Sequence, residues 1–265
     1  MPTMPTGSCD VHPSATVSPN AEIASDVYVG PYSVIGDRVR IGSGCRFESH
    51  VVVEGPTTIG EDNVFYPYGT IGLPPQDLKF QGEETFLTIG SHNVFREYVN
   101  VNRGTSGGGG HTRIGDHCYF MVYAHVAHDC ILGDHVMMAN AATLGGHVVI
   151  EDHGTVGAFS GVHPFCHVGA HGWIGGYSVV TKDVLPFSKT VTPRHTKAYG
   201  VNTLGLERQG FSPERISNIK KVFRLLLQSR LNTAQALEAI REQVDSSDAR
   251  TIIEFIEKSP RGVVK

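Results

Sequence analysis

An apolar residue recurs at every sixth position between Val11 and Val180, with two interruptions. The first run ends at Ile71, the pattern resumes in the same phase at Ile89, and it restarts one residue out of phase at Ile114. A period of six fits neither the 3.6 residues of a helical turn nor the two-residue alternation of an ordinary strand. It is typical of hexapeptide β-helices, in which each hexad supplies one short strand and one corner.

We therefore predict an all-β solenoid, a parallel β-helix spanning residues 1–190. Three hexads form one triangular coil, so residues eighteen apart in the sequence stack vertically at the usual strand spacing of about 4.8 Å. This rule places side chains in space from the sequence alone.

The pattern changes to a helical one after Phe211, and we predict an α-helical domain over residues 191–265. Ser212 can cap a helix that has Pro213 in its first turn. Apolar residues then follow on one face of this helix: Ile216, Ile219, Val222, Phe223 and Leu226. Two further helices are expected, one after Thr233 and one near Asp248.

Composition favours a cytoplasmic protein without an integral membrane span. No segment reaches the length of a membrane span, and the N-terminus lacks the basic and apolar regions of a signal peptide. Four of the five cysteines share the small fifth position of a hexad and are predicted to fill the core, rather than to form disulfides or a thiolate metal site: Cys45, Cys118, Cys130 and Cys166.

The net charge of −4 is unevenly distributed. Residues 182–230 hold ten Lys and Arg against three acidic residues, whereas residues 1–181 hold seven against seventeen. The basic segment is either a solvated helical face or a docking surface for an acidic partner. A nucleic-acid partner is not expected, because aromatic residues do not alternate with these charges.

The two interruptions are predicted to be loops, at residues 72–88 and 103–113. The first preserves the phase and is expected to replace about one coil's length; it carries the polar residues Gln76, Asp77 and Lys79. The second contains a run of four glycines. The run lacks the Lys-Ser/Thr of a phosphate loop, so we interpret it as a flexible flap.

Two groups of histidines follow from the stacking rule. The members of one group follow one another at intervals of eighteen residues, each at the fourth position of its hexad: His117, His135, His153 and His171. This corner position is normally exposed, which favours a ladder of neutral imidazoles at the surface over a ladder of metal sites.

The second group lies in three stacked hexads that begin at Val126, Leu144 and Val162. Gly146 lies directly above His128, Asp129 follows His128, and further histidines lie nearby: His125, His147 and His163. A histidine is a good general base at neutral pH, and a glycine above it can present a bare backbone N–H to an oxyanion. No serine or cysteine has a credible nucleophile setting, so this edge is predicted to support direct acyl transfer without an acyl-enzyme.

Several motifs in the chain closely resemble those of the UDP-N-acetylglucosamine O-acyltransferase family, which opens lipid A biosynthesis in Gram-negative bacteria. The matching stretches include PQDLKF, RGT followed by GGGG, AHVAHDC, ANAATLGGHV and GLERQGFS. The resemblance runs from about His12 to the C-terminal helices. It implies a left-handed β-helix that assembles as a homotrimer with active sites between subunits.

The resemblance also implies roles for individual residues. His128 matches the general base, helped by Asp129, and Gly146 matches the oxyanion donor. Residues that match those holding the sugar nucleotide are Asp77, Lys79, His125, His147 and His163, with Gln76 beside Asp77. Residues that match those near the nucleotide portion are Asn202 and Arg208. Gly176 falls where the family sets acyl length. No cofactor or metal is implied; the donor is a (3R)-hydroxyacyl group on acyl carrier protein and the acceptor is UDP-N-acetylglucosamine.

Four positions depart from the family pattern: Pro164, Leu204, Asn102 and Gln209. They bear on donor or nucleotide recognition more than on the His128–Gly146 centre. A family variant that acylates a 3-amino sugar nucleotide and forms an amide therefore stays open. Two other classes also stay open, namely a zinc enzyme resembling γ-class carbonic anhydrase and a non-catalytic solenoid scaffold.

Overall fold

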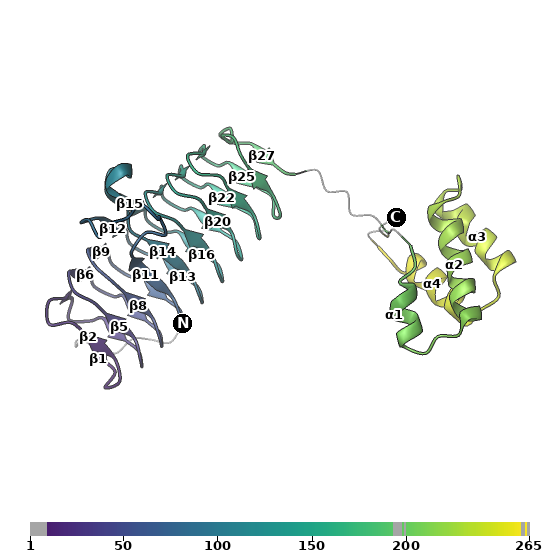
Figure 1. The fold of residues 1–265 in the computed structure, drawn as a ribbon, viewed down its shortest axis with the longest axis horizontal. Helices are drawn as coiled ribbons and strands as arrows, with labels where there is room; N and C mark the ends of the chain where they lie inside the picture. Colours follow the sequence, from purple (N-terminus) through teal and green to yellow (C-terminus); the bar gives the residue numbers. More distant parts are fainter. Residues whose placement is uncertain (1–9, 193–197, 199, 261–262, 264–265) are drawn as a thin grey trace. The chain divides into compact units, whose positions relative to one another are not determined.

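A computed structural model describes residues 10–192, 198, 200–260 and 263. The chain divides into two compact units, Met1–Thr192 and Pro193–Lys265. Figure 1 shows coils stacked along one axis in the first unit and packed helices in the second.

The first unit is the predicted left-handed parallel β-helix, with short strands distributed over three sheets. Sheet A contains β1 (Asp10–Val11), β4 (Tyr28–Val29), β7 (Arg46–Phe47), β10 (Val64–Phe65), β13 (Val94–Phe95), β16 (Tyr119–Phe120), β19 (Met137–Met138), β22 (Thr155–Val156), β25 (Trp173–Ile174) and β27 (Lys189–Thr190). Sheet B contains β2 (Thr16–Val17), β5 (Val34–Ile35), β8 (Val52–Val53), β11 (Thr70–Leu73), β14 (Asn100–Asn102), β17 (His125–Val126), β20 (Thr143–Leu144), β23 (Gly161–Val162) and β26 (Val179–Val180). Sheet C contains β3 (Glu22–Ile23), β6 (Val39–Ile41), β9 (Thr57–Ile59), β12 (Phe86–Ile89), β15 (His111–Ile114), β18 (Ile131–Leu132), β21 (Val149–Ile150) and β24 (His167–Val168).

The chain visits sheets A, B and C in turn, so each coil has three corners, which we name AB, BC and CA after the sheets they join. Strand register follows the eighteen-residue rule in regular coils, where Val126 pairs with Leu144 and Leu144 with Val162. The first hexad residue points into the core, whose largest side chains include four stacked phenylalanines with ring centroids 4.6–4.7 Å apart: Phe47, Phe65, Phe95 and Phe120.

The register explains both interruptions of the period. Thr70 pairs with Asn100, thirty residues away, so the first loop adds twelve residues to a regular coil. The expectation that it replaces a coil's length is wrong, because β11 and β12 still pair with the coils on either side. Asn100 pairs with His125, twenty-five residues away, so the second loop adds seven. Twelve is a multiple of six and keeps the phase, whereas seven shifts it by one residue.

The predicted histidine ladder occupies the CA corner and gains a fifth member, His92. Neighbouring imidazoles stack with centroids 4.5–4.9 Å apart and planes within 2–8° of parallel. Parallel rings do not converge on a shared metal, so this arrangement favours the ladder of exposed imidazoles. The four hexad cysteines are buried and unbridged, as predicted for core residues.

The second unit contains α1 (Thr203–Arg208), α2 (Pro213–Leu227), α3 (Thr233–Gln243) and α4 (Ser247–Glu257). Ser212 caps α2 by accepting the N–H of Arg215, as predicted, and Asn232 caps α3. The sequence analysis did not predict the short helix α1. Among the described residues, no helix has the length and apolar character needed to cross a bilayer.

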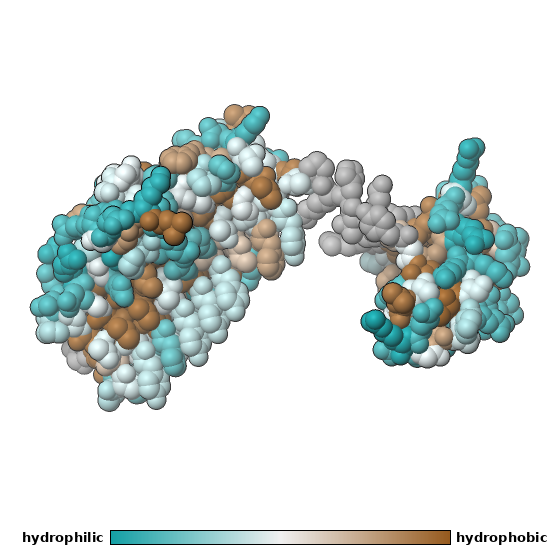
Figure 2. Space-filling view, in the orientation of Figure 1, coloured by the Kyte–Doolittle hydropathy of each residue, from teal (hydrophilic) through white to brown (hydrophobic). Residues whose placement is uncertain are grey.

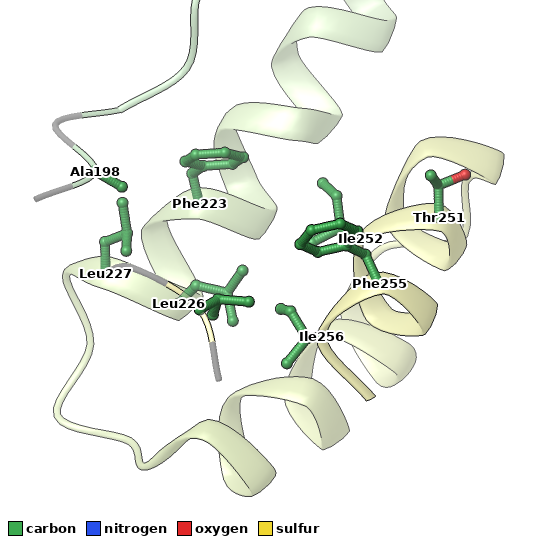
Figure 3. A pocket seen from close by; sticks show the side chains of 9 residues that line it. Ala198, Phe223, Leu226, Leu227, Thr251, Ile252, Phe255 and Ile256 are labelled. Carbon is green, nitrogen blue, oxygen red and sulfur yellow. The ribbon is translucent and has the colours of Figure 1, made fainter. Parts of the chain in front are cut away.

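An apolar pocket of about 310 Å³ opens between α2 and α4 within this unit (Figure 3). Phe223, Leu226 and Leu227 line it from α2, and Ile252, Phe255 and Ile256 line it from α4. Figure 2 shows brown, apolar atoms at the surface of this unit. Among the described residues that line it, Thr251 is the one polar side chain, and the others are apolar.

Candidate active site

The residues singled out in the sequence gather along the BC corner of successive coils. From the lower coils upward, this corner carries the 72–88 loop, the glycine-rich loop, the His128–Asp129 pair, the Gly146–His147 pair and the His163–Pro164 pair. Because each coil of the β-helix returns to the same corner, residues that are far apart in the sequence lie on one edge.

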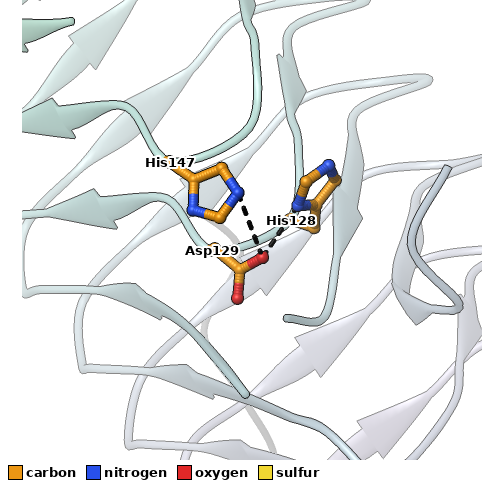
Figure 4. Close-up of side chains that lie close together, drawn as sticks. All are labelled: His128, Asp129 and His147. Carbon is orange, nitrogen blue, oxygen red and sulfur yellow. Dashed lines mark hydrogen bonds and ion pairs between the residues drawn. The ribbon is translucent and has the colours of Figure 1, made fainter. Parts of the chain in front are cut away.

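His128 and Asp129 form a hydrogen-bonded pair at this corner (Figure 4). His128 Nδ1 lies 2.8 Å from Asp129 Oδ2. The Asp129 side chain is 1% exposed and that of His128 is 16% exposed. A carboxylate only accepts hydrogen bonds, so Asp129 selects the imidazole tautomer with the proton on Nδ1 and leaves the Nε2 lone pair available.

Gly146 lies against the face of the His128 ring, as the stacking rule predicts. A Cβ at position 146 would come within 2.5 Å of His128 Cε1 and 2.7 Å of Nε2. Only a residue without a side chain allows this approach.

The Gly146 N–H donates no hydrogen bond within the described chain. At the CA corner, the third-position N–H groups of Asp116 and Asp134 each donate to an aspartate one coil above, at 2.8 and 2.9 Å. Pro164 holds the corresponding place above Gly146 and offers no carboxylate. The N–H beside His128 is thus left available for a substrate oxygen.

His147 completes the cluster. Its ring meets that of His128 edge-on at a centroid distance of 5.2 Å and stacks on Phe165 at 4.3 Å. His147 Nε2 lies 3.8 Å from Asp129 Oδ2, beyond hydrogen-bonding distance, so the carboxylate is committed to His128 rather than to His147.

The other two histidines of the predicted edge bond elsewhere. His125 Nδ1 lies 2.7 Å from Asn100 Oδ1, and burial, reinforced by the nearby His128, lowers the pKa of His125. His163 is exposed, and its Nδ1 lies 3.0 Å from the carbonyl oxygen of its neighbour Pro164. The structure therefore brings two of the four imidazoles into ring contact.

The remaining predicted residues lie in other elements than the turn that carries His128. Asp77 closes a turn in the 72–88 loop, where its carboxylate accepts the N–H of Lys79 at 2.9 Å; Gln76 and Lys79 are exposed. Gly176 lies at the AB corner, directly above Ala158. Asn202 caps α1 and Arg208 ends it, with Leu204 exposed between them and Gln209 following as the C-cap.

The sequence analysis missed the role of the glycine-rich loop. Instead of a free flap, the loop folds over Asp129, and Thr105 donates its N–H and its hydroxyl to the two carboxylate oxygens, at 2.9 and 2.6 Å. The fourth hexad position, which Asp129 occupies, is exposed or half-buried in the other coils, so the sequence alone did not indicate that this carboxylate would be covered.

His128, Asp129 and His147 offer ligand atoms within 4.8 Å of one another, so the cluster was tested as a metal site. Two ligands on one tetrahedral zinc are separated by about 3.4 Å, given metal–ligand distances near 2.1 Å. The 2.8 Å between His128 Nδ1 and Asp129 Oδ2 is shorter and is a direct hydrogen bond. Asp129 also accepts both Thr105 donors. The donor set fits an oriented base better than a zinc site.

Comparison with known proteins agrees with this chemistry. Residues 183–264 match the family model described as UDP-N-acetylglucosamine O-acyltransferase, domain 2, and residues 20–55 and 111–146 match the bacterial transferase hexapeptide repeat. The acyl-[acyl-carrier-protein]–UDP-N-acetylglucosamine O-acyltransferase of Syntrophobacter fumaroxidans is 44% identical over 256 residues, which cover 96% of this chain and 99% of that relative. This chain belongs to the UDP-N-acetylglucosamine O-acyltransferase family.

Other members extend the match. The acyltransferase of the same name from Thermodesulfovibrio yellowstonii is 43% identical over 97% of this chain and 99% of its own length. The solved structure of LpxA from Acinetobacter baumannii is 40% identical with a TM-score of 0.68, covering 96% of this chain and 99% of that one. LpxA of Bacteroides fragilis, a UDP-N-acetylglucosamine acyltransferase, is 36% identical with a TM-score of 0.67 over 96% of this chain and all of that one. Membership confirms the predicted family, fold and enzyme class.

Proposed function

We propose that this chain transfers a (3R)-hydroxyacyl group from acyl carrier protein to the 3-hydroxyl of UDP-N-acetylglucosamine, the first step of lipid A biosynthesis. The observation that carries the proposal is the His128–Asp129 pair with the unpaired N–H of Gly146 beside it. A base and an oxyanion donor on one edge are what ester formation from an activated acyl group requires.

The proposed reaction is one displacement at the acyl thioester. His128 Nε2 removes the proton of the 3-hydroxyl as its oxygen attacks the thioester carbonyl carbon. The carbonyl oxygen gains negative charge and accepts the Gly146 N–H, while Asp129 stabilises the imidazolium. The tetrahedral intermediate formed by this attack collapses, the C–S bond breaks, and His128 returns the proton to the leaving thiolate. The products are the 3-O-acyl sugar nucleotide and the carrier-protein thiol.

The polar residues around this centre are proposed to hold the acceptor. Gln76, Asp77 and Lys79 lie in the loop two coils below His128. His147 and His163 lie at the same corner, and His125 lies in β17, the strand that leads into it. Asn202 and Arg208 would contact the nucleotide portion.

The place of Gly176 supports a homotrimer, if Gly176 limits the acyl chain as the family resemblance implies. An acyl channel that starts at His128 on the BC corner and is limited by Gly176 on the AB corner needs two chains side by side, since these corners are different edges of one coil. A closed ring of three chains repeats this contact without a free end. Gly176 has no side chain to fill such a channel.

The basic segment 182–230 is proposed to receive the acidic carrier protein. Its lysines and arginines on α2, among them Lys220, Lys221 and Arg224, are exposed. Opposite charges speed encounter between such partners. We place the proposed reaction in the cytoplasm.

The deciding experiment is mass spectrometry of the products formed from mixed hydroxyacyl carrier-protein donors with either UDP-N-acetylglucosamine or its 3-amino analogue. We expect an ester of UDP-N-acetylglucosamine and complete loss of turnover in His128→Ala, with the folded assembly retained. Product from the 3-amino analogue alone would favour the amide-forming variant, and substantial activity of His128→Ala would overturn the assigned base.

Metal analysis of the same preparation distinguishes the zinc class. One bound zinc per chain that is lost in His128→Ala would favour it. A folded assembly without product from any donor would favour a scaffold.

A further inference from the structure

The glycine-rich loop covers a carboxylate that its position in the coil would otherwise expose. Asp129 holds the fourth hexad position, like the exposed His117, His135 and His153 of the CA corner. Asp129 is nevertheless only 5% exposed. The chain from Gly104 to Gly110 folds over it and removes water from one side of the His128–Asp129 pair.

Thr105 supplies two hydrogen bonds that fix the orientation of this carboxylate. Its backbone N–H donates to Oδ1 at 2.9 Å, and its hydroxyl donates to Oδ2 at 2.6 Å. The hydroxyl is itself held by the N–H of Gly108, at 3.1 Å. Oδ2 thus accepts hydrogen bonds from both Thr105 Oγ1 and His128 Nδ1. A rotation of the carboxylate toward His147 would break both bonds.

Gly108 is required for this approach. A Cβ at position 108 would lie 2.1 Å from Asp129 Cγ, whereas one at position 104 would first meet the loop's own backbone, 2.3 Å from His111 N. Gly107, between them, has open space around its Cβ direction and no positive φ. The glycine at position 108 is therefore required by the carboxylate, and Gly107 beside it is not.

The loop is also tied to the neighbouring 72–88 loop. The Ser106 hydroxyl donates to Glu83 Oε1 at 3.0 Å, and the N–H of Gln81 donates to the other oxygen at 2.7 Å. The residue next to Thr105 thus connects the support of Asp129 to the loop that bears Asp77 and Lys79.

We infer that the 104–110 loop is a clamp on Asp129, and that Thr105 is a positioning residue that acts through Asp129 to aim His128 at the acceptor hydroxyl. The role rests on the proposed acyl transfer. It assigns the loop to the orientation of the base and not to phosphate binding or to gating.

Thr105→Val tests the hydroxyl, because valine keeps the shape and the backbone N–H. We expect kcat to fall about ten- to a hundred-fold, as for the loss of one hydrogen bond to a charged group, with KM for the sugar nucleotide within about two-fold of wild type. Thr105→Ser restores the hydroxyl and should recover most of kcat. Thr155→Val, on sheet A, is the matched control and should leave kcat unchanged.

Gly108→Ala and Gly107→Ala form a second pair. Gly108→Ala should reduce kcat at least as much as Thr105→Val, whereas Gly107→Ala should be close to wild type. Equal loss in both alanine variants, or equal loss in Thr105→Val and Thr105→Ser, would mean that the loop matters only as structure and would overturn the inference.

The hydrogen-bonded Nδ1 proton of His128, observed by NMR, gives a readout that does not depend on turnover. We expect this resonance in wild type and Thr105→Ser, and its broadening or loss in Thr105→Val. An unchanged resonance with unchanged kcat in Thr105→Val would refute the positioning role. If the resonance is lost in Thr105→Val but the wild-type protein makes no acylated product, the positioning role of the loop stands and the proposed acyl transfer is rejected.

Discussion

Gly146 and His128 are separated by one coil and lie in contact, so that the glycine has no room for a Cβ above the imidazole. A Cβ at position 146 would lie 2.5 Å from His128 Cε1, which is shorter than any ordinary contact between non-bonded carbon atoms. The same glycine presents the N–H that is proposed to stabilise the oxyanion.

Gly146→Ala should therefore damage the reaction more than the fold. The new methyl group displaces the His128 ring or the corner that carries the N–H, and we expect kcat to fall at least a hundred-fold, in the range seen when an oxyanion donor is removed. Steady-state kinetics checks the loss, and circular dichroism should show an unchanged β-helix.

Gly161→Ala, in β23 of the coil above, is the matched control, since its Cβ would meet nothing within 4 Å. A kcat for Gly146→Ala within three-fold of this control would contradict the role assigned to the contact.

Asp129→Asn should reduce kcat while the corner keeps its conformation. Asp129 has φ 58°, in the left-handed region that asparagine tolerates well. The amide cannot stabilise an imidazolium and can present a donor to His128, which favours the wrong tautomer. We expect a loss of about 10³-fold or more in kcat, by analogy with the buried aspartate of hydrolytic triads.

The comparison variant is Asp134→Asn, at the exposed CA corner. Equal activity of the two variants would show that the 2.8 Å bond between His128 and Asp129 has no part in catalysis.

The core phenylalanine column should dominate the stability of the β-helix. Phe95 is 1% exposed and stacks on Phe65 and Phe120 at 4.7 Å. Phe95→Ala removes contacts on both sides, and we expect it to lower the free energy of unfolding by about 3–5 kcal/mol. Tyr98→Ala, in the exposed aromatic column of the AB corner, should cost less than about 1.5 kcal/mol; denaturant unfolding measures both.

The buried thiols predict how the protein responds to alkali. Burial raises the pKa of Cys118 and of Cys130 to about 12, and that of Cys45 to about 11. Thiols in an unfolded chain lose their protons near pH 8.5. The folded state keeps these protons, so the free energy of unfolding is unaffected by the thiols below about pH 8.5 and falls as the pH rises from there toward 12.

Two measurements check this behaviour. In a Cys9→Ser variant, a thiol reagent at pH 8 should label the native protein at these three positions only after denaturant is added. Urea unfolding between pH 8 and 10.5 should show stability declining with pH, and Cys118→Ala should make the decline shallower. Rapid native labelling of Cys118 would contradict the burial.

The sequence was sufficient to place Gly146 over His128, because a fixed period converts residue number into height and corner. It was not sufficient for the loops, where the period stops. Nothing in GTSGGGG indicates that Thr105 reaches Asp129, since that contact spans twenty-four residues and depends on how an aperiodic segment folds back. Helix α1 was missed for a related reason, because six residues are too few to display an amphipathic pattern.

The roles of Gly176, Asn202 and Arg208 came from family resemblance alone. Their proposed neighbours belong to another chain or another unit, and no period connects them to His128.

The two insertions at the BC corner add twelve and seven residues, yet the strands above and below them keep their pairing. Backbone pairing along the three sheets keeps the coils in register, so the 74–85 loop, two coils below His128, can vary in sequence without moving that imidazole. The glycine-rich loop cannot, because Thr105 holds Asp129. Acceptor choice and proton transfer are consequently separable traits in this architecture. A library that varies only residues 74–80, and so keeps Glu83 and its bond to Ser106, should alter which sugar nucleotide is accepted while the reaction chemistry stays the same.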